Sequence, residues 1–133
     1  MKIKQKAVRE AEPIFTFKEL NTEFNRDERR SAAKTLRGVL TLFGPRGENW
    51  VKNNYKATSV IDGDLVTKAC LVGAIEKVDG PGEWIAQQAL LAQITKSYKG
   101  EFDTLEEFND DQETKFSNIK NLVVRAIKNL NAQ

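Results

Sequence analysis

The sequence contains no histidine and a single cysteine, Cys70, and these scarcities exclude several kinds of chemistry. A lone cysteine cannot form an internal disulfide, so we expect a protein of the reducing cytoplasm. Without histidine, the commonest general base and the commonest metal ligand are both missing. The chain also lacks a phosphate-binding loop, because Gly44-Pro45-Arg46-Gly47 does not end in Gly-Lys-Ser or Gly-Lys-Thr and follows a predicted helix rather than a strand.

Long apolar runs are also absent, and no stretch approaches the ~20 residues that span a bilayer. The lysine-rich N-terminus has no apolar stretch behind it, which argues against a secretory signal. At 133 residues, with 40% hydrophobic and 30% charged side chains, the chain fits one globular domain with its own core. We therefore expect no membrane partner.

Apolar residues recur at helical spacing in several segments of the chain. The pattern predicts helices over about residues 27–43, 83–97 and 114–130, with Gly44 and Pro45 ending the first. Asp64 is a suitable N-cap for a further helix over about residues 65–78. In the helix over 83–97, we expect Trp84 to be buried and Gln93 to face water.

The remaining segments have weaker patterns. Residues 14–17 are typical of an extended piece, and residues 101–113 of an acidic loop that holds Leu105 and Phe108. Strand-forming residues before Asp62-Gly63 allow a small β-hairpin around residues 50–63. The predicted fold is mostly α: a single compact domain of four to five helices over residues 26–133, with residues 1–25 as an N-terminal extension or arm packing on it.

Charge is distributed unevenly along the chain, although the net charge is only +2. Residues 1–56 carry 13 basic and seven acidic side chains, whereas residues 57–133 carry eight basic and 12 acidic ones. Such asymmetry can steer a charged partner or make two copies associate head to tail. The candidate partner-binding residues are Glu101, Asp103, Glu106, Glu107, Asp110, Asp111, Arg29, Arg30, Lys34 and Arg37.

No residue is a strong candidate for catalysis or for binding a metal or a cofactor. Cys70 lies in an apolar stretch, so we expect a small buried residue rather than a nucleophile. The acidic segment lacks the residue order of a calcium loop, and Asn109-Asp110 is typical of turn and capping chemistry. We predict that the protein is not an enzyme. A small-ligand or enzymatic pocket near Trp50, Tyr55, Cys70 and Asn109-Asp110 stays as an alternative.

An ordered set of residues resembles a family of small uncharacterised proteins from bacterial and phage genomes. The matching positions include Leu36 with Leu40, Gly47 with Trp50, Ala57, Gly63, Cys70-Leu71 with Gly73-Ala74, Phe108-Asn109-Asp110, and Val123 with Ala126-Ile127. The resemblance spans roughly residues 30–130, and Phe108 stands where the family pattern has tryptophan. It implies a mostly helical fold and a site built around Trp50, Cys70 and Asn109-Asp110, but no particular activity.

The preferred functional hypothesis is a small non-enzymatic protein that binds a macromolecular partner, such as a phage-encoded inhibitor or accessory factor. A protein partner is favoured, and a homo-oligomer is compatible with the charge asymmetry. The alternative is a nucleic-acid-binding module that uses basic residues of the N-terminal half, namely Lys2, Lys4, Lys6, Arg29, Arg30, Lys34 and Arg37.

Overall fold

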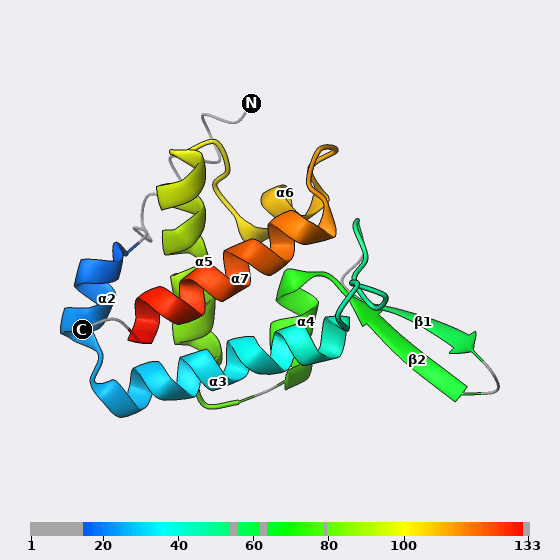
Figure 1. Cartoon of the computed structure of the whole chain (residues 1–133), viewed down its shortest axis with the longest axis horizontal. Helices are drawn as coiled ribbons and strands as arrows, with labels where there is room; N and C mark the ends of the chain where they lie inside the picture. Colours follow the sequence, from blue (N-terminus) through cyan, green and yellow to red (C-terminus); the bar gives the residue numbers. More distant parts are fainter. Residues whose placement is uncertain (1–14, 54–55, 62–63, 79, 132–133) are drawn as a thin grey trace.

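A computed structural model describes residues 15–53, 56–61, 64–78 and 80–131 of the chain. This part is mostly helical and forms one compact domain with a β-hairpin projecting from it (Figure 1). The elements are α2 (Phe17–Glu23), α3 (Arg26–Phe43), β1 (Lys56–Ile61), β2 (Asp64–Ala69), α4 (Leu71–Val78), α5 (Glu83–Tyr98), α6 (Leu105–Asp110) and α7 (Phe116–Asn131). The prediction of a mostly α fold is confirmed.

The long helix α3 begins at a capping box and ends at a glycine. Asn25 and Glu28 form a capping box, in which each side chain accepts a hydrogen bond from the other residue's backbone N–H at 2.8 Å. Gly44 ends the helix with a positive φ of 84°, which favours glycine. The predicted helix over residues 27–43 is therefore confirmed.

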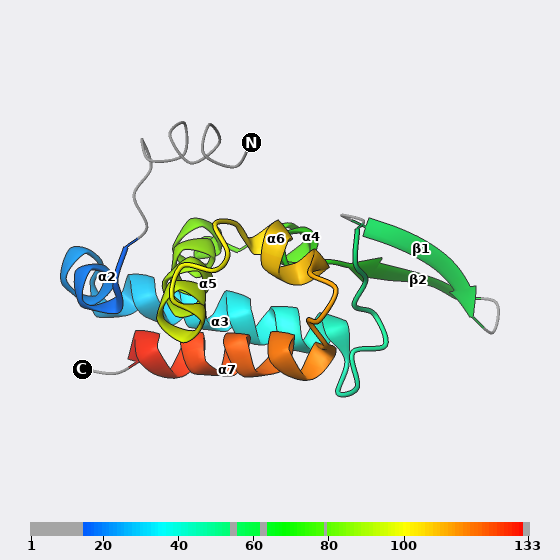
Figure 2. The same cartoon turned by 90° about the horizontal axis from the view of Figure 1, so that it is seen from above.

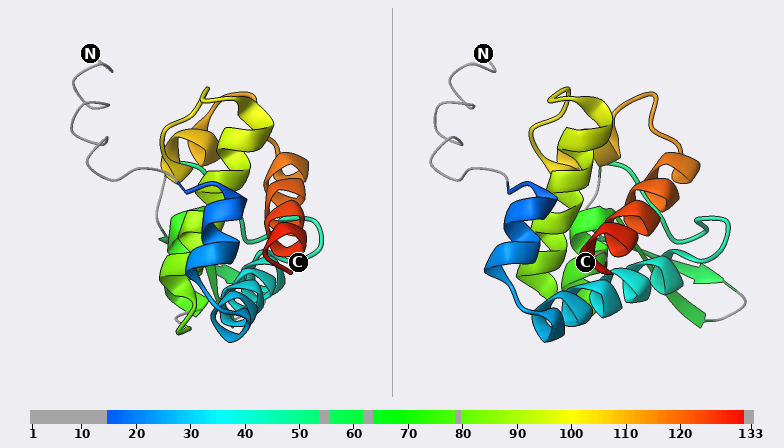
Figure 3. Two further views of the ribbon diagram at one scale, coloured as in Figure 1. Left: turned by 90° about the vertical axis from the view of Figure 1, so that its left-hand side faces the viewer. Right: turned by 60° about the vertical axis from the view of Figure 1, so that its left-hand side comes forward.

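Helices α3 and α7 lie side by side and antiparallel (Figure 2). The Phe43 ring at the end of α3 packs edge-on against the Phe116 ring at the start of α7, with centroids 5.9 Å apart. At the other end, the Arg29 side chain reaches the carbonyl of Leu130. Helices α4 and α5 pack against this pair, and α2 packs against α5 and α7 (Figure 3).

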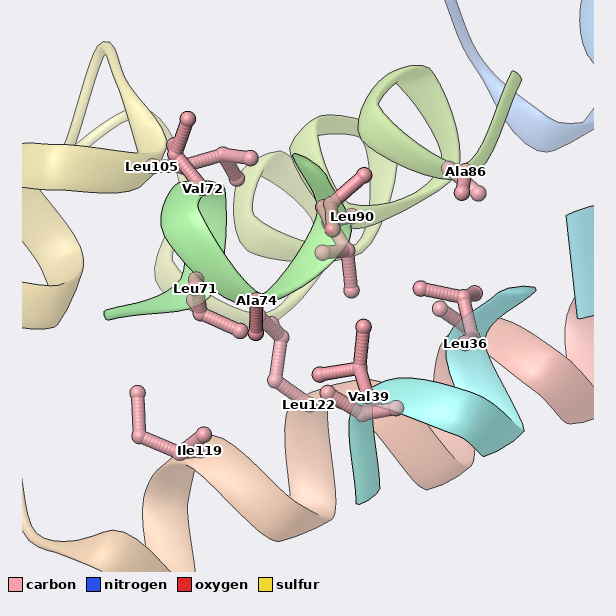
Figure 4. Close-up of a cluster of buried hydrophobic side chains, with 14 of the residues drawn as sticks. Leu36, Val39, Leu71, Val72, Ala74, Ala86, Leu90, Leu105, Ile119 and Leu122 are labelled. Atoms are coloured by element: carbon pink, nitrogen blue, oxygen red, sulfur yellow. The ribbon is translucent and has the colours of Figure 1, made fainter. Parts of the chain in front are cut away.

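The core lies where α3, α4, α5 and α7 meet (Figure 4). Leu36, Leu71, Ala74, Leu90 and Ile119 have no exposed surface. Burying each large aliphatic side chain contributes about 1.5–3 kcal/mol to folding. The apolar stripes of the separate helices therefore combine into one core.

The hairpin and the helix after it differ from the prediction. Strands β1 and β2 pair antiparallel from Lys56↔Ala69 to Ile61↔Asp64, so the hairpin begins and ends about six residues later than expected. The prediction that Asp64 caps a helix is wrong, because residues 64–69 form β2 and α4 begins only at Leu71. Val66 and Thr67 are β-branched and favour a strand. Asp62-Gly63, the predicted turn, lies outside the described residues.

Two short helices form where an extended segment and a loop were expected. A capping box between Thr16 and Glu19 starts α2 at Phe17, so of the predicted extended piece over residues 14–17 Thr16 is extended, Phe17 is helical, and residue 14 lies outside the described residues. The hydroxyl of Thr104 accepts the N–H of Glu107 and starts α6 inside the predicted acidic loop. With both, the described part of the chain holds six helices rather than four or five.

Helix α5 is confirmed, but two of its side chains face the opposite way from the prediction. Trp84 is 53% exposed, while Gln93 is 3% exposed. The buried amide of Gln93 donates to Ser97 Oγ and accepts from Asn129 of α7 at 2.7 Å. Trp84 lies at the helix start, where its ring meets Phe15 and Phe24 edge-on rather than entering the core.

Candidate partner-binding surface

The outer side of the α3–α7 pair carries a set of basic side chains, which we call the basic face. It comprises Arg26, Arg30, Lys34 and Arg37 of α3 with Lys120 and Lys128 of α7, all exposed. Arg26, Arg30 and Arg37 recur at four- and seven-residue spacing, so one side of α3 presents all three. Helix α7 contains no aspartate or glutamate. Two segments about 90 residues apart in the sequence thus contribute basic side chains, while exposed Asp27 and Glu28 lie in the first turn of α3.

A groove indents this surface between the start of α3 and the end of α7. Its volume is about 280 Å³, and its lining consists of Arg26, Arg29, Arg30, Arg37, Leu130 and Asn131. The exposed guanidinium groups of Arg26, Arg30 and Arg37 in this groove repel one another unless an anion lies among them. Guanidinium groups also match carboxylates and phosphates in bidentate hydrogen bonds. The groove therefore has the chemistry of an anion-binding site.

The four arginines of the groove have different roles. The side chains of Arg26, Arg30 and Arg37 make no hydrogen bond or ion pair with any other described residue. Arg29 is only 7% exposed and donates from Nη1 to the carbonyl of Leu130 at 3.1 Å and from Nε to that of Phe24 at 3.2 Å. It thus satisfies a carbonyl at the negative end of the α7 dipole.

Arg29 was grouped with Arg30 and Arg37 as a partner-binding candidate, and its burial corrects that grouping. Arg29 is buried because it precedes Ala32 and Leu36 at helical spacing and so lies on the core side of α3. Arg30, Lys34 and Arg37 are exposed, as a binding role requires.

Three of the seven carboxylates between Glu101 and Glu113 accept backbone N–H groups. Glu107 accepts the N–H of Asp103 at 2.8 Å, and Asp111 accepts that of Glu113 at 3.0 Å. Asp110 accepts the N–H of Asn53 at 2.7 Å. The side chains of Glu101, Asp103 and Glu106 make no such bond within the described residues. Much of this acidic segment therefore stabilises its own fold.

Three of the residues that carry the family resemblance, Trp50, Leu71 and Asp110, meet around the side chain of Asn109, which is fully buried. Its Oδ1 accepts the indole N–H of Trp50 at 2.7 Å and the backbone N–H of Leu71 at 3.1 Å. Its Nδ2 donates to the carbonyl of Val51 at 3.1 Å and to Asp110 at 2.8 Å. We call this set the Asn109 hub. It ties α6, the start of α4 and the Trp50 loop together, and its amide has no hydrogen-bonding capacity left for a ligand.

Cys70 and Tyr55 were the other two residues predicted to line a pocket. Cys70 directly precedes α4, rather than lying two turns inside a helix, and its Sγ accepts the N–H of Gly73 at 3.4 Å. Burial raises the pKa of the Cys70 thiol more than the N–H groups of Gly73 and Val72 lower it. A neutral buried thiol is a poor nucleophile. Tyr55 lies outside the described residues.

The burial of Asn109 is the main feature that sequence reasoning missed, because Asn109-Asp110 was expected to cap a turn. Trp50 is 59 residues away in the sequence, so no local pattern joins the two side chains. Gly47, three residues before Trp50, has a φ of 75° and lies against the Phe116 ring, where a side chain would collide with the ring. The family-like spacing of Gly47, Trp50 and Asn109 thus matches the packing of this region.

The fold and its surface define a class: a small, mostly helical domain with a buried asparagine hub and a basic face on two antiparallel helices. No helix of the described residues has the length and apolar character that crossing a membrane demands. Residues 27–129 match a family of unknown function, DUF6197, and the chain belongs to this family. The predicted resemblance to an uncharacterised family is therefore confirmed. No curated protein and no solved structure matches the chain.

Proposed function

We propose that this protein acts by binding an acidic protein partner on the basic face. The observation that carries the proposal is the groove in which Arg26, Arg30 and Arg37 have no partner among the described residues. Exposed guanidinium groups gathered on one surface repel one another, and an acidic partner would relieve that repulsion. Arginine is also enriched at protein interfaces and among their energetic hot spots.

An exposed apolar side chain on the same surface favours a protein over a nucleic acid. Val124 is 45% exposed, and it lies one turn from Lys120 and about two turns from Asn131 on the side of α7 that faces the groove. Half-buried Ile127 extends this apolar strip. Apolar contact at the centre with charge around it is the usual anatomy of a protein interface. A phosphate backbone would gain nothing from Val124.

A protein of this kind fits the role of a cytoplasmic inhibitor or accessory factor, encoded by a phage or a bacterium, that acts by occupying a partner's acidic surface. The nucleic-acid alternative would use the same arginines. It predicts that the affinity falls steeply as the salt concentration rises, because each neutralised phosphate releases a counterion.

The test is a capture experiment from nuclease-treated host lysate with two charge-reversal variants. Arg30→Glu/Arg37→Glu reverses two charges of the basic face, and Lys18→Glu/Lys96→Glu reverses two exposed charges elsewhere as a matched control. We expect the first variant to lose a protein that the wild type and the control retain, as identified by mass spectrometry. Retention of the same proteins by all three would contradict the proposal.

A third variant, Val124→Ala, separates the two partner classes. It removes exposed apolar surface without changing charge and leaves a good helix former in α7. Binding of the captured protein should weaken severalfold. If nuclease treatment removes all captured material and Val124→Ala has no effect, the partner is a nucleic acid and the proposal fails.

A further inference from the structure

A second groove is lined by residues from the end of α5, from the segments on either side of α6 and from the start of α7. We call it the acidic–aromatic groove. Its volume is about 460 Å³, and it is lined by Tyr98, Glu101, Phe102, Asp111, Glu113, Thr114 and Asn118. None of these residues belongs to the basic face. Three carboxylates, two aromatic rings and no basic side chain line it.

Two of the three carboxylates are available to a ligand. Glu101 and Glu113 make no hydrogen bond or ion pair through their side chains with any residue that the structure describes. The third, Asp111, accepts the N–H of Glu113. Lys52 donates to the backbone carbonyl of Asp111 at 2.9 Å but does not line the groove, and neither do Lys99 and Lys115, which follow Tyr98 and Thr114 in the sequence. The negative charge of the groove is therefore largely uncompensated.

A buried hydroxyl provides an independent indication that the groove receives a ligand. Thr114 is only 6% exposed, and within the described part of the chain its hydroxyl forms no hydrogen bond. The hydroxyl is not among the fully enclosed polar atoms that lack a partner, so it keeps some accessible surface, and Thr114 is one of the residues that line the groove. A polar group in this position usually has a partner, and a ligand with N–H donors would provide one.

The aromatic side chains restrict the kind of ligand. Tyr98 and Phe102 pack edge-to-face with ring centroids 5.6 Å apart, and both are half-buried on top of fully buried Phe108. Ring faces attract organic cations, and guanidinium groups stack on them readily. A hydrated metal ion gains little from such walls, because hard cations prefer a shell of oxygen ligands.

We propose that the acidic–aromatic groove binds an arginine or lysine side chain of a peptide segment. The carboxylates of Glu101 and Glu113 pair with the cation, the ring faces of Tyr98 and Phe102 cover it, and the Thr114 hydroxyl accepts one of its N–H groups. On the far side of Tyr98 and Asn118, an adjoining groove contains Arg125. That charge disfavours a cation there and limits the site to the side of Glu101 and Glu113.

The experiment uses the full chain and two labelled, acetylated peptides of alternating residues. One peptide alternates glycine with arginine, and the other replaces arginine with citrulline, which keeps the shape but removes the charge. We expect the arginine peptide to bind at least tenfold more tightly by fluorescence anisotropy. Glu101→Gln/Glu113→Gln should weaken its binding about tenfold, whereas Glu23→Gln/Glu76→Gln, which changes net charge equally at exposed positions elsewhere, should leave it within twofold.

A further variant tests the aromatic wall without altering charge. Phe102→Leu keeps apolar volume but removes the ring, and we expect a loss of about threefold, in keeping with a partly exposed cation–π contact. Equal binding of both peptides, equal weakening by both double variants, or no binding of the arginine peptide would overturn the proposal. Unchanged binding by Phe102→Leu would overturn the role of the ring.

Discussion

The Asn109 hub and the basic face are both rich in polar groups. The polar groups of the hub hydrogen-bond within the protein, whereas those of the basic face are exposed to solvent. Asn109 is fully buried, and all the hydrogen bonds its amide can make are formed within the protein. Arg26, Arg30 and Arg37 are exposed and make none through their side chains with the described residues. The comparison separates residues that hold the fold from residues that are free to bind. It also assigns the family-like pattern around Trp50 and Asn109 to the fold.

The largest expected effect comes from breaking the hub. Asn109→Ala leaves the indole N–H of Trp50, the N–H of Leu71 and the carbonyl of Val51 without their partner. Each unsatisfied buried group costs about 1–3 kcal/mol, so we expect the free energy of unfolding to fall by about 3–5 kcal/mol. Urea denaturation followed by tryptophan fluorescence measures this. A loss below about 1 kcal/mol would show that the hub does not hold the three segments together.

The next effect contrasts two adjacent arginines. Arg29→Ala removes the charged donor to the carbonyls of Leu130 and Phe24, and should cost about 2–3 kcal/mol of stability. Arg30→Ala changes an exposed position and should stay within about 0.5 kcal/mol of the wild type, while it reduces partner capture. Thermal denaturation together with the capture experiment checks both. Similar stability losses in both variants would remove the distinction between them.

The smallest effect concerns Cys70 and pH. Because burial raises the pKa of the thiol in the folded state, the folded protein holds this proton more tightly than the unfolded chain does. The contribution of Cys70 to stability is therefore complete below the unfolded pKa of about 8.5 and is lost as the pH rises through the folded pKa. Cys70→Ala should abolish this alkaline component in urea titrations between pH 7 and about pH 10. An unchanged pH profile would contradict the assignment.

Helices α3 and α7 have strong apolar periodicity and lie where the sequence pattern indicated, whereas α5 lies where predicted although its apolar periodicity is weak, which is why its Trp84 and Gln93 were assigned to the wrong sides. The boundary between β2 and α4 could not, because Asp64 is a good N-cap while Val66 and Thr67 favour the strand pairing that prevails. The short helices α2 and α6 depend on caps whose partners lie three residues away, a signal that was present in Thr16-x-x-Glu19.

The sites were less predictable because they depend on contacts between distant segments. Arg29 lies three residues before Ala32 and seven before Leu36, and this helical spacing indicated that Arg29 faces the core. No local pattern indicated the contacts of Asn109 with Trp50, Val51 and Leu71, and only the family resemblance had grouped Asn109 with Trp50. The groove beside Arg26, Arg30 and Arg37 exists only because the end of α7 returns to the start of α3.

The antiparallel pairing of α3 with α7 also affects how the chain folds during its synthesis. The Arg29–Leu130 hydrogen bond joins residues 101 positions apart, and the apolar stripe of α3 is covered partly by a helix that is synthesised long after it. Until α7 emerges, part of that stripe stays exposed to water or to chaperones. The α3–α7 pair is therefore expected to form only after α7 has been synthesised, and loss of α7 would leave the first long helix without its partner.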